Sequence, residues 1–152
     1  RTGCDLLPET IAHLNESDLV IGIKEATGDL ERAKAIMSAS DIKLYSGDDE
    51  TSCDLMLMGG SGTISVTANV APKKMAKMSE AALSGNFELA KSLDSELRGL
   101  HRDLFLESNP IPVKWALHEM GKIETGIRLP MTQLAPEHHR FLRESLLQAG
   151  AI

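Results

Sequence analysis

Over residues 1–70, the chain alternates between short apolar runs and segments in which apolar residues recur at helical spacing. We predict strands at residues 19–24, 42–45 and 63–66, and helices at about 8–15, 30–40 and 50–58. The first predicted strand is continuously apolar and rich in β-branched residues, which is typical of a parallel strand buried on both faces. Because a helix separates each strand from the next, the pattern predicts βα units of a parallel sheet.

The pattern changes after this region, and no strand candidate of similar strength follows. We predict helices at about 72–83, 86–106, 111–120 and 136–148. An open parallel sheet of three strands would leave long unpaired edges, whereas eight βα units close into a barrel of about 250 residues. We therefore interpret the chain as α/β, a partial (β/α)₈ TIM barrel. Residues 1–70 would be its C-terminal part, and residues 71–152 its last helix and a C-terminal helical region.

Composition narrows the class of protein. Of the 152 residues, 42% are hydrophobic and 25% are charged, which is typical of a globular domain and not of a disordered chain. The formal net charge is -6 and the basic residues are dispersed, so we expect no nucleic-acid partner.

The two cysteines and the hydropathy pattern indicate a compartment. Cys4 and Cys53 are too few for a disulfide framework or a four-ligand zinc site, and reduced thiols fit a cytoplasmic protein. No apolar stretch approaches the roughly 18 residues that a membrane span needs. We therefore predict a cytoplasmic protein without a membrane partner.

Lys24 ends the first predicted strand, and active sites of parallel α/β folds lie at the carboxyl ends of strands. A lysine that closes an apolar strand is partly desolvated, and its neutral amine can attack a carbonyl group to form a Schiff base. The alternative is a lysine that only marks the end of the strand and points into solvent or pairs with Glu25.

The residues around Lys24 read GIKEATGD over 22–29. This segment resembles the Schiff-base lysine motif of the dihydrodipicolinate synthase / N-acetylneuraminate lyase superfamily of class I, pyruvate-dependent aldolases. Further segments match in the superfamily's order: RTG at 1–3, SGDD at 46–49, GGSGTISVTANV at 59–70 and NPIPVK at 109–114. The resemblance covers essentially the whole sequence, and it implies the C-terminal half of a barrel enzyme.

The resemblance also implies a reaction. Lys24 would form an imine with pyruvate, without cofactor or metal, and the enamine would attack L-aspartate-4-semialdehyde. The product would be 4-hydroxy-tetrahydrodipicolinate, in lysine (diaminopimelate) biosynthesis. Arg1 would bind the carboxylate of the semialdehyde, since a planar guanidinium suits bidentate capture. Taken without the motif, Arg1 would be interpreted as a surface arginine.

Gly47 and Ile64 are implied as pyruvate-site residues, Gly47 through its backbone and Ile64 through its carbonyl oxygen. Judged by residue type alone, Gly47 lets main chain approach a ligand closely, and Ile64 is by default a core residue. The superfamily's relay tyrosines and threonine lie before Arg1 in its order and match no residue of this sequence. We therefore expect the chain alone to have negligible synthase activity. The resemblance further implies a homotetramer, assembled as a dimer of dimers.

Two alternatives stay open. Another aldolase of the superfamily, such as N-acetylneuraminate lyase or a 2-keto-3-deoxy sugar-acid aldolase, would share the chemistry of Lys24. Arg1 argues against the sialic acid lyase, because a dicarboxylate-forming synthase needs a second carboxylate-binding group there. A homologue without catalytic activity could instead serve only as an assembly module, and absence of the relay tyrosine from the native gene would favour it.

Other candidates are interpreted as structural. The acids at 48–50 follow a strand and are expected to cap a helix and not to bind a metal. His138 and His139 lack the spacing of a zinc pair, and we expect them to be solvated. The glycines at 59–62 precede a strand instead of opening a helix, which argues against a phosphate loop.

Overall fold

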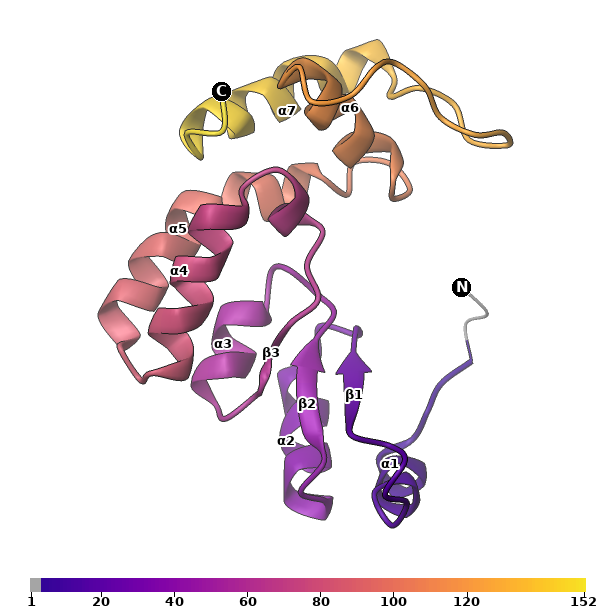
Figure 1. Ribbon diagram of the computed structural model, residues 1–152, viewed down its shortest axis with the longest axis vertical. Coiled ribbons are helices and arrows are strands. Elements are labelled where there is room, and N and C mark those ends of the chain that lie inside the picture. The colour runs from indigo at the N-terminus through magenta and orange to yellow at the C-terminus, as the bar shows by residue number, and fades with distance from the viewer. Residues whose placement is uncertain (1–3) are drawn as a thin grey trace. The chain divides into compact units, whose positions relative to one another are not determined.

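The computed structural model describes residues 4–152 (Figure 1). The chain divides into two compact units, Arg1–Ile64 and Ser65–Ile152. The domain boundary predicted at residue 70 would separate the barrel strands from the helical region in a complete barrel. This boundary stays a prediction. No helix within residues 4–152 combines the length and the apolar character that crossing a bilayer requires.

The first unit alternates helices and strands, as the sequence pattern predicts. Its elements are α1 (Pro8–Leu14), β1 (Gly22–Glu25), α2 (Leu30–Ala39), β2 (Lys43–Ser46), α3 (Ser52–Leu57) and β3 (Gly62–Thr63). The strands form one sheet in the order β1-β2-β3, and both pairs are parallel (Figure 1). The predicted βα units of a parallel sheet are therefore confirmed.

One face of this sheet packs on the helices. The core that joins them consists of aliphatic side chains from α1, α2, β2, α3 and the turn before β2, namely Ile11, Ala33, Ile36, Ile42, Leu44 and Leu55. Ile23 and Leu44 are register partners on β1 and β2, and both belong to this packing. Because side chains alternate across a strand, Lys24 and its partner Tyr45 lie on the opposite face.

Glycines leave room for Tyr45 on that opposite face. A Cβ atom at Gly22 of β1 would lie 3.0 Å from Cε2 of Tyr45, and one at Gly62 of β3 would lie 3.2 Å from its Cδ1. The Tyr45 ring therefore occupies space on both sides of its own strand, which side chains larger than glycine at positions 22 and 62 would fill.

The first and third strands are shorter than predicted, whereas β2 has the predicted length and is shifted by one residue. The strand expected at 19–24 begins only at Gly22, because the backbone N–H of Val20 donates to Ser17 in a turn, at 3.1 Å. Leu19 and Ile21 are 92% and 81% exposed, so the expectation of burial on both faces is wrong here. The strand expected at 63–66 ends at Thr63, since Val66 has helical dihedral angles and leads into a 3₁₀ turn.

The second unit is helical, as predicted. It contains the 3₁₀ turn η1 (Thr67–Asn69) and the helices α4 (Pro72–Leu83), α5 (Phe87–Asp103), α6 (Ile111–Glu119) and α7 (Pro136–Gln148). Helix α5 packs against α4 and α7. Met75 and Met78 are buried on α4, where they are packing residues. Next to this packing, Nδ1 of the buried His101 lies 2.9 Å from the hydroxyl of Thr67, which connects α5 to η1.

Candidate active site

The predicted site residues of the first unit lie along one edge of the sheet. Lys24 is the last but one residue of β1, Gly47 directly follows β2, and Ile64 directly follows β3. The backbone N–H of Gly47 donates to the carbonyl of Glu25 at 2.6 Å, and that of Ile64 donates to Ser46 at 2.7 Å. The parallel topology therefore brings Lys24, Gly47 and Ile64 to the same carboxyl edge.

The side chain of Lys24 lies directly over Gly47. A Cβ atom at position 47 would be 2.5 Å from Cε of Lys24, 2.9 Å from its Cγ and 2.8 Å from Cβ of Ala26. Real Cβ atoms do not approach other atoms so closely. A larger residue at position 47 would therefore displace the lysine stem from this path, a steric reason for Gly47 that the sequence alone does not give.

The amine of Lys24 is not engaged by its neighbour Glu25. Glu25 is buried, and its carboxylate accepts hydrogen bonds from Arg32 Nε at 2.8 Å and from the backbone N–H of Thr27 at 2.6 Å. Within residues 4–152, Lys24 forms no ion pair, which removes the predicted alternative of a Lys24–Glu25 pair. Lys24 is exposed, so the expectation that it is partly desolvated is wrong for the described chain.

Two other predicted positions differ from expectation or lie outside the structure. Ile64 is 52% exposed, so its default interpretation as a core residue is wrong. Ile64 lies at the carboxyl edge, and its implied role in the pyruvate site stays a prediction. Arg1 lies outside the described residues, and its implied role also stays a prediction.

The loops at this edge are held by short polar contacts. One carboxylate oxygen of Asp48 accepts the backbone N–H and the hydroxyl of Thr51, at 3.0 and 2.7 Å, just before α3. Asp48 thus orders the turn that leads into α3, but α3 itself has no side-chain cap, so the predicted capping of this helix is wrong. Gly28 has a φ of 75°, and a Cβ atom there would lie 3.3 Å from Oδ2 of Asp48. The loops after β1 and β2 are therefore adjacent. Among the described residues, no three His, Cys, Asp or Glu side chains are grouped so as to hold a metal ion.

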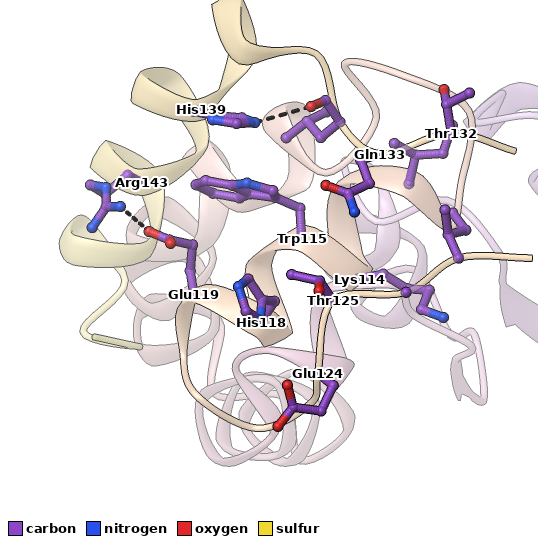
Figure 2. Close-up of a pocket in the computed structure, with 14 residues that line it drawn as sticks. Lys114, Trp115, His118, Glu119, Glu124, Thr125, Thr132, Gln133, His139 and Arg143 are labelled. Carbon is purple, nitrogen blue, oxygen red and sulfur yellow. Dashed lines mark hydrogen bonds and ion pairs between the residues drawn. The ribbon is translucent and has the colours of Figure 1, made fainter.

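The second unit has a pocket of its own, of about 260 Å³, which no sequence pattern predicts (Figure 2). It lies between one face of α6, the segment 124–134 and the first half of α7. The Trp115 ring stacks on His139 with centroids 4.6 Å apart, and Nε2 of His139 lies 3.0 Å from the carbonyl oxygen of Leu134. His139 is half-buried, so the expectation that it is solvated is wrong.

Charged groups of both signs line this pocket. Arg143 on α7 forms an ion pair with Glu119 on α6, and Lys114 and Glu124 also contribute to the lining. Sequence patterns gave no signal for the pocket as a whole because its walls come from three separate segments. The available signals were local: the single tryptophan of the chain, and the one-turn spacing of His139 and Arg143.

Comparison with known protein families tests the family membership that the motifs indicate. A model described as the dihydrodipicolinate synthetase family matches residues 1–149. The chain belongs to this family. The resemblance inferred from the motifs is therefore confirmed.

Members of the dihydrodipicolinate synthetase family from several bacteria are similar to the chain. A 4-hydroxy-tetrahydrodipicolinate synthase from Alcanivorax borkumensis is 56% identical over 154 aligned positions, which cover 100% of this chain and 52% of that protein. The protein of the same name from Pseudomonas aeruginosa is 54% identical, with 100% and 53% covered. The chain thus spans about half the length of these curated relatives.

Solved structures of the family have the same fold. The chloride-inhibited dihydrodipicolinate synthase from Acinetobacter baumannii, complexed with pyruvate, superimposes with a TM-score of 0.97 at 52% identity, over 100% of this chain and 53% of that one. The synthase from Thermotoga maritima gives 0.94 at 40% identity, with 100% and 54% covered. The three-stranded sheet corresponds to the last βα units of the family's TIM barrel, as predicted.

Proposed function

We propose that the protein to which this chain belongs is a 4-hydroxy-tetrahydrodipicolinate synthase. This lyase would condense pyruvate with L-aspartate-4-semialdehyde in lysine (diaminopimelate) biosynthesis. The family and the names of the similar proteins support the proposal. The observation that carries it is Lys24, whose stem lies over Gly47 at the carboxyl edge of the sheet and whose amine forms no ion pair within residues 4–152.

The proposed reaction begins at the amine of Lys24. In its neutral form the amine adds to C2 of pyruvate, and loss of water leaves an imine. A proton then leaves C3, and the electron pair of that C–H bond forms the enamine. C3 bonds to the aldehyde carbon of the second substrate, whose oxygen takes up a proton. The amino group of the second substrate finally adds to the imine carbon, closes the ring and releases Lys24.

The other residues of the proposed site bind substrates. Gly47 would bring its backbone to pyruvate, and Ile64 would direct its carbonyl oxygen toward pyruvate or the amine of Lys24. Arg1 would bind the carboxylate of the semialdehyde through its guanidinium, whose fixed fork matches the two carboxylate oxygens. Because the imine itself stores the electrons of the reacting carbon, the proposed chemistry uses no metal and no cofactor.

We further propose that the complete protein is cytoplasmic and assembles as a homotetramer, a dimer of dimers. The family resemblance supports this assembly. One solved relative is described as a monomeric dihydrodipicolinate synthase variant, so subunit assembly is a property to measure for each member. Analytical ultracentrifugation of the full-length product of the native gene tests it, and a monomer at micromolar concentration would contradict it.

The imine is tested by trapping with borohydride. The full-length product is incubated with pyruvate and sodium borohydride, digested and mapped by mass spectrometry. We expect a reduced pyruvyl adduct on Lys24 and none in Lys24→Arg. Lys43→Arg is the matched control, because Lys43 is an exposed lysine on the neighbouring strand, and its trapping is expected to equal that of the unmodified protein.

Two results would contradict the proposal: label on another lysine only, or no label in the unmodified protein. The second substrate is tested separately by adding L-aspartate-4-semialdehyde or N-acetylneuraminate to the same preparation. Turnover with the sialic acid alone would favour the lyase branch of the superfamily.

A further inference from the structure

Arg32 connects two segments that are far apart in the sequence. It lies in the first turn of α2, where its Nε donates to Oε2 of Glu25 at 2.8 Å. Its Nη2 donates to Oδ1 of Asp5 at 2.8 Å and also to the carbonyl oxygen of Leu6. A single guanidinium therefore joins the end of β1 to the segment that precedes α1.

Each partner of Arg32 is close in sequence to a residue of the proposed site. Glu25 directly follows Lys24, the proposed nucleophile, and Asp5 lies four positions after Arg1, the proposed carboxylate-binding group. We propose that Arg32 is a positioning residue, which holds the segment following Arg1 against the strand end that carries Lys24. This inference rests on the function proposed above and adds to it a residue that touches neither substrate.

The Glu25 side of this connection is firmly held. The carboxylate of Glu25 is buried, and each of its oxygens accepts a hydrogen bond, one from Arg32 and one from the backbone of Thr27. The carbonyl of the same residue accepts the N–H of Gly47. A buried carboxylate that loses its partners is strongly unfavourable, so the position of Glu25 is fixed by Arg32 on one side and by β2 on the other.

The Asp5 side is more exposed and depends on the shape of the guanidinium. Asp5 is 56% exposed, whereas Arg32 is only 16% exposed. Both terminal nitrogens of Arg32 face the Asp5 carboxylate, at 2.8 and 3.3 Å, while Nε remains with Glu25. A lysine has one compact ammonium group and cannot reproduce this fork. Arginine is therefore the residue type that can hold both segments at once.

The start of α2 fixes the guanidinium itself. Oδ1 of Asp29 accepts the backbone N–H groups of Glu31 and Arg32, at 2.9 and 3.2 Å, and so caps the helix. Because capping anchors the backbone of Arg32, its side chain has a defined origin from which to reach Glu25 and Asp5.

The two sides of the connection predict separable kinetic effects. Loss of the Asp5 contact should loosen only the segment of Arg1, and so weaken capture of the semialdehyde without changing imine formation at Lys24. Loss of Arg32 should also disturb Glu25, and so slow imine formation. A purely structural role would lower the amount of active protein. It would reduce the apparent kcat and the amount of trapped adduct, and it would leave KM for the semialdehyde and the trapping rate constant unchanged.

The experiment compares Asp5→Ala, Arg32→Gln and Arg32→Lys in the full-length product of the native gene. For Asp5→Ala, we expect KM for L-aspartate-4-semialdehyde to rise roughly tenfold, with an unchanged rate of borohydride trapping by pyruvate. For Arg32→Gln, we expect the same rise in KM and slower trapping. Arg32→Lys should restore much of the trapping rate, because its ammonium still neutralises Glu25, but should leave KM raised.

The control is Lys34→Gln, which removes an exposed ion pair with Glu31 on the same helix and should change neither measurement. If Asp5→Ala has the kinetics of Lys34→Gln, the inference is wrong. Since Asp5 is exposed, this variant remains informative even if Arg32→Gln fails to fold. If the unmodified protein is not trapped with pyruvate at all, the proposed function fails, and this inference fails with it.

Discussion

Gly47 and the stem of Lys24 share a space that has no room for a Cβ atom: an atom there would lie only 2.5 Å from Cε of the lysine. The obstruction comes from the residue that the proposed chemistry needs, and from Ala26 in the loop that follows β1. Position 47 thus controls where the amine of Lys24 can lie, independently of any contact between Gly47 and a substrate.

We therefore predict that Gly47→Ala displaces the amine and slows imine formation with pyruvate by about a hundredfold, because misplacement of a reacting group by about 1 Å has effects of this size. The rate of borohydride trapping measures it. Gly126→Ala is the control, since nothing lies within 4 Å of a Cβ atom there and its φ is not positive. A trapping rate of Gly47→Ala within twofold of the control would contradict the prediction.

The parts of the structure that the sequence predicted are those set by local pattern. The helices of the second unit follow the apolar spacing closely: α4 and α7 have the predicted bounds, and α5 begins one residue later and ends three residues earlier than predicted. Lys24 lies at the carboxyl end of its strand, as the pattern of 19–24 indicated. Such features depend on neighbours within one or two turns of chain.

The parts that could not be predicted depend on distant residues. No sequence pattern indicates a role for Arg32, because its partners Glu25 and Asp5 are 7 and 27 positions away. The stacking of His139 on Trp115 joins two helices that are separated in the sequence, so no local pattern around His139 predicts it. Ile64 is an apolar residue after a strand, and only the sheet geometry shows that it lies at an exposed edge.

The ion pairs of Arg32 should persist at alkaline pH. Hydrogen bonding to Glu25, together with the charge of Asp5, raises the pKa of Arg32 above its ordinary value. A raised pKa in the folded state means that the stabilisation is fully present below the unfolded pKa, and is lost only as the pH rises through the folded one. The hydrogen bond to Glu25 also protects the Nε–H of the largely buried Arg32 from exchange with solvent. We therefore expect its NMR signal to remain visible at about pH 9, where exposed arginines such as Arg98 have lost theirs. Early loss of the Arg32 signal would contradict this.

A buried hydrogen bond between α7 and α5 offers a test of stability. Oγ of Ser145 donates to Oδ2 of Asp103 at 2.6 Å, and both residues are buried. Ser145→Ala would leave a buried carboxylate oxygen with fewer donors, so we expect a loss of about 1.5–3 kcal/mol in the free energy of unfolding, measured in urea.

The matched control for Ser145 lies on α5. Ser95 donates an equally short bond, 2.7 Å, to the carbonyl of Ser92, but it is exposed. Ser95→Ala should therefore change the free energy of unfolding by no more than about 0.5 kcal/mol. Equal losses in the two variants would show that burial of Asp103 does not determine the effect.

The stacked pair of Trp115 and His139 should contribute a measurable coupling between α6 and α7. Their centroids are 4.6 Å apart with an interplanar angle of 23°, and aromatic pairs of this kind contribute about 0.5–1.5 kcal/mol beyond the area they bury. A double-mutant cycle with Trp115→Leu and His139→Leu should give a coupling energy in that range. His138 provides the control, because it adjoins His139 in sequence but does not line the pocket, so its cycle with Trp115 should give a coupling near zero. A similar coupling for both histidines would mean that the helices respond to the substitutions as a whole, and not through the stacked rings.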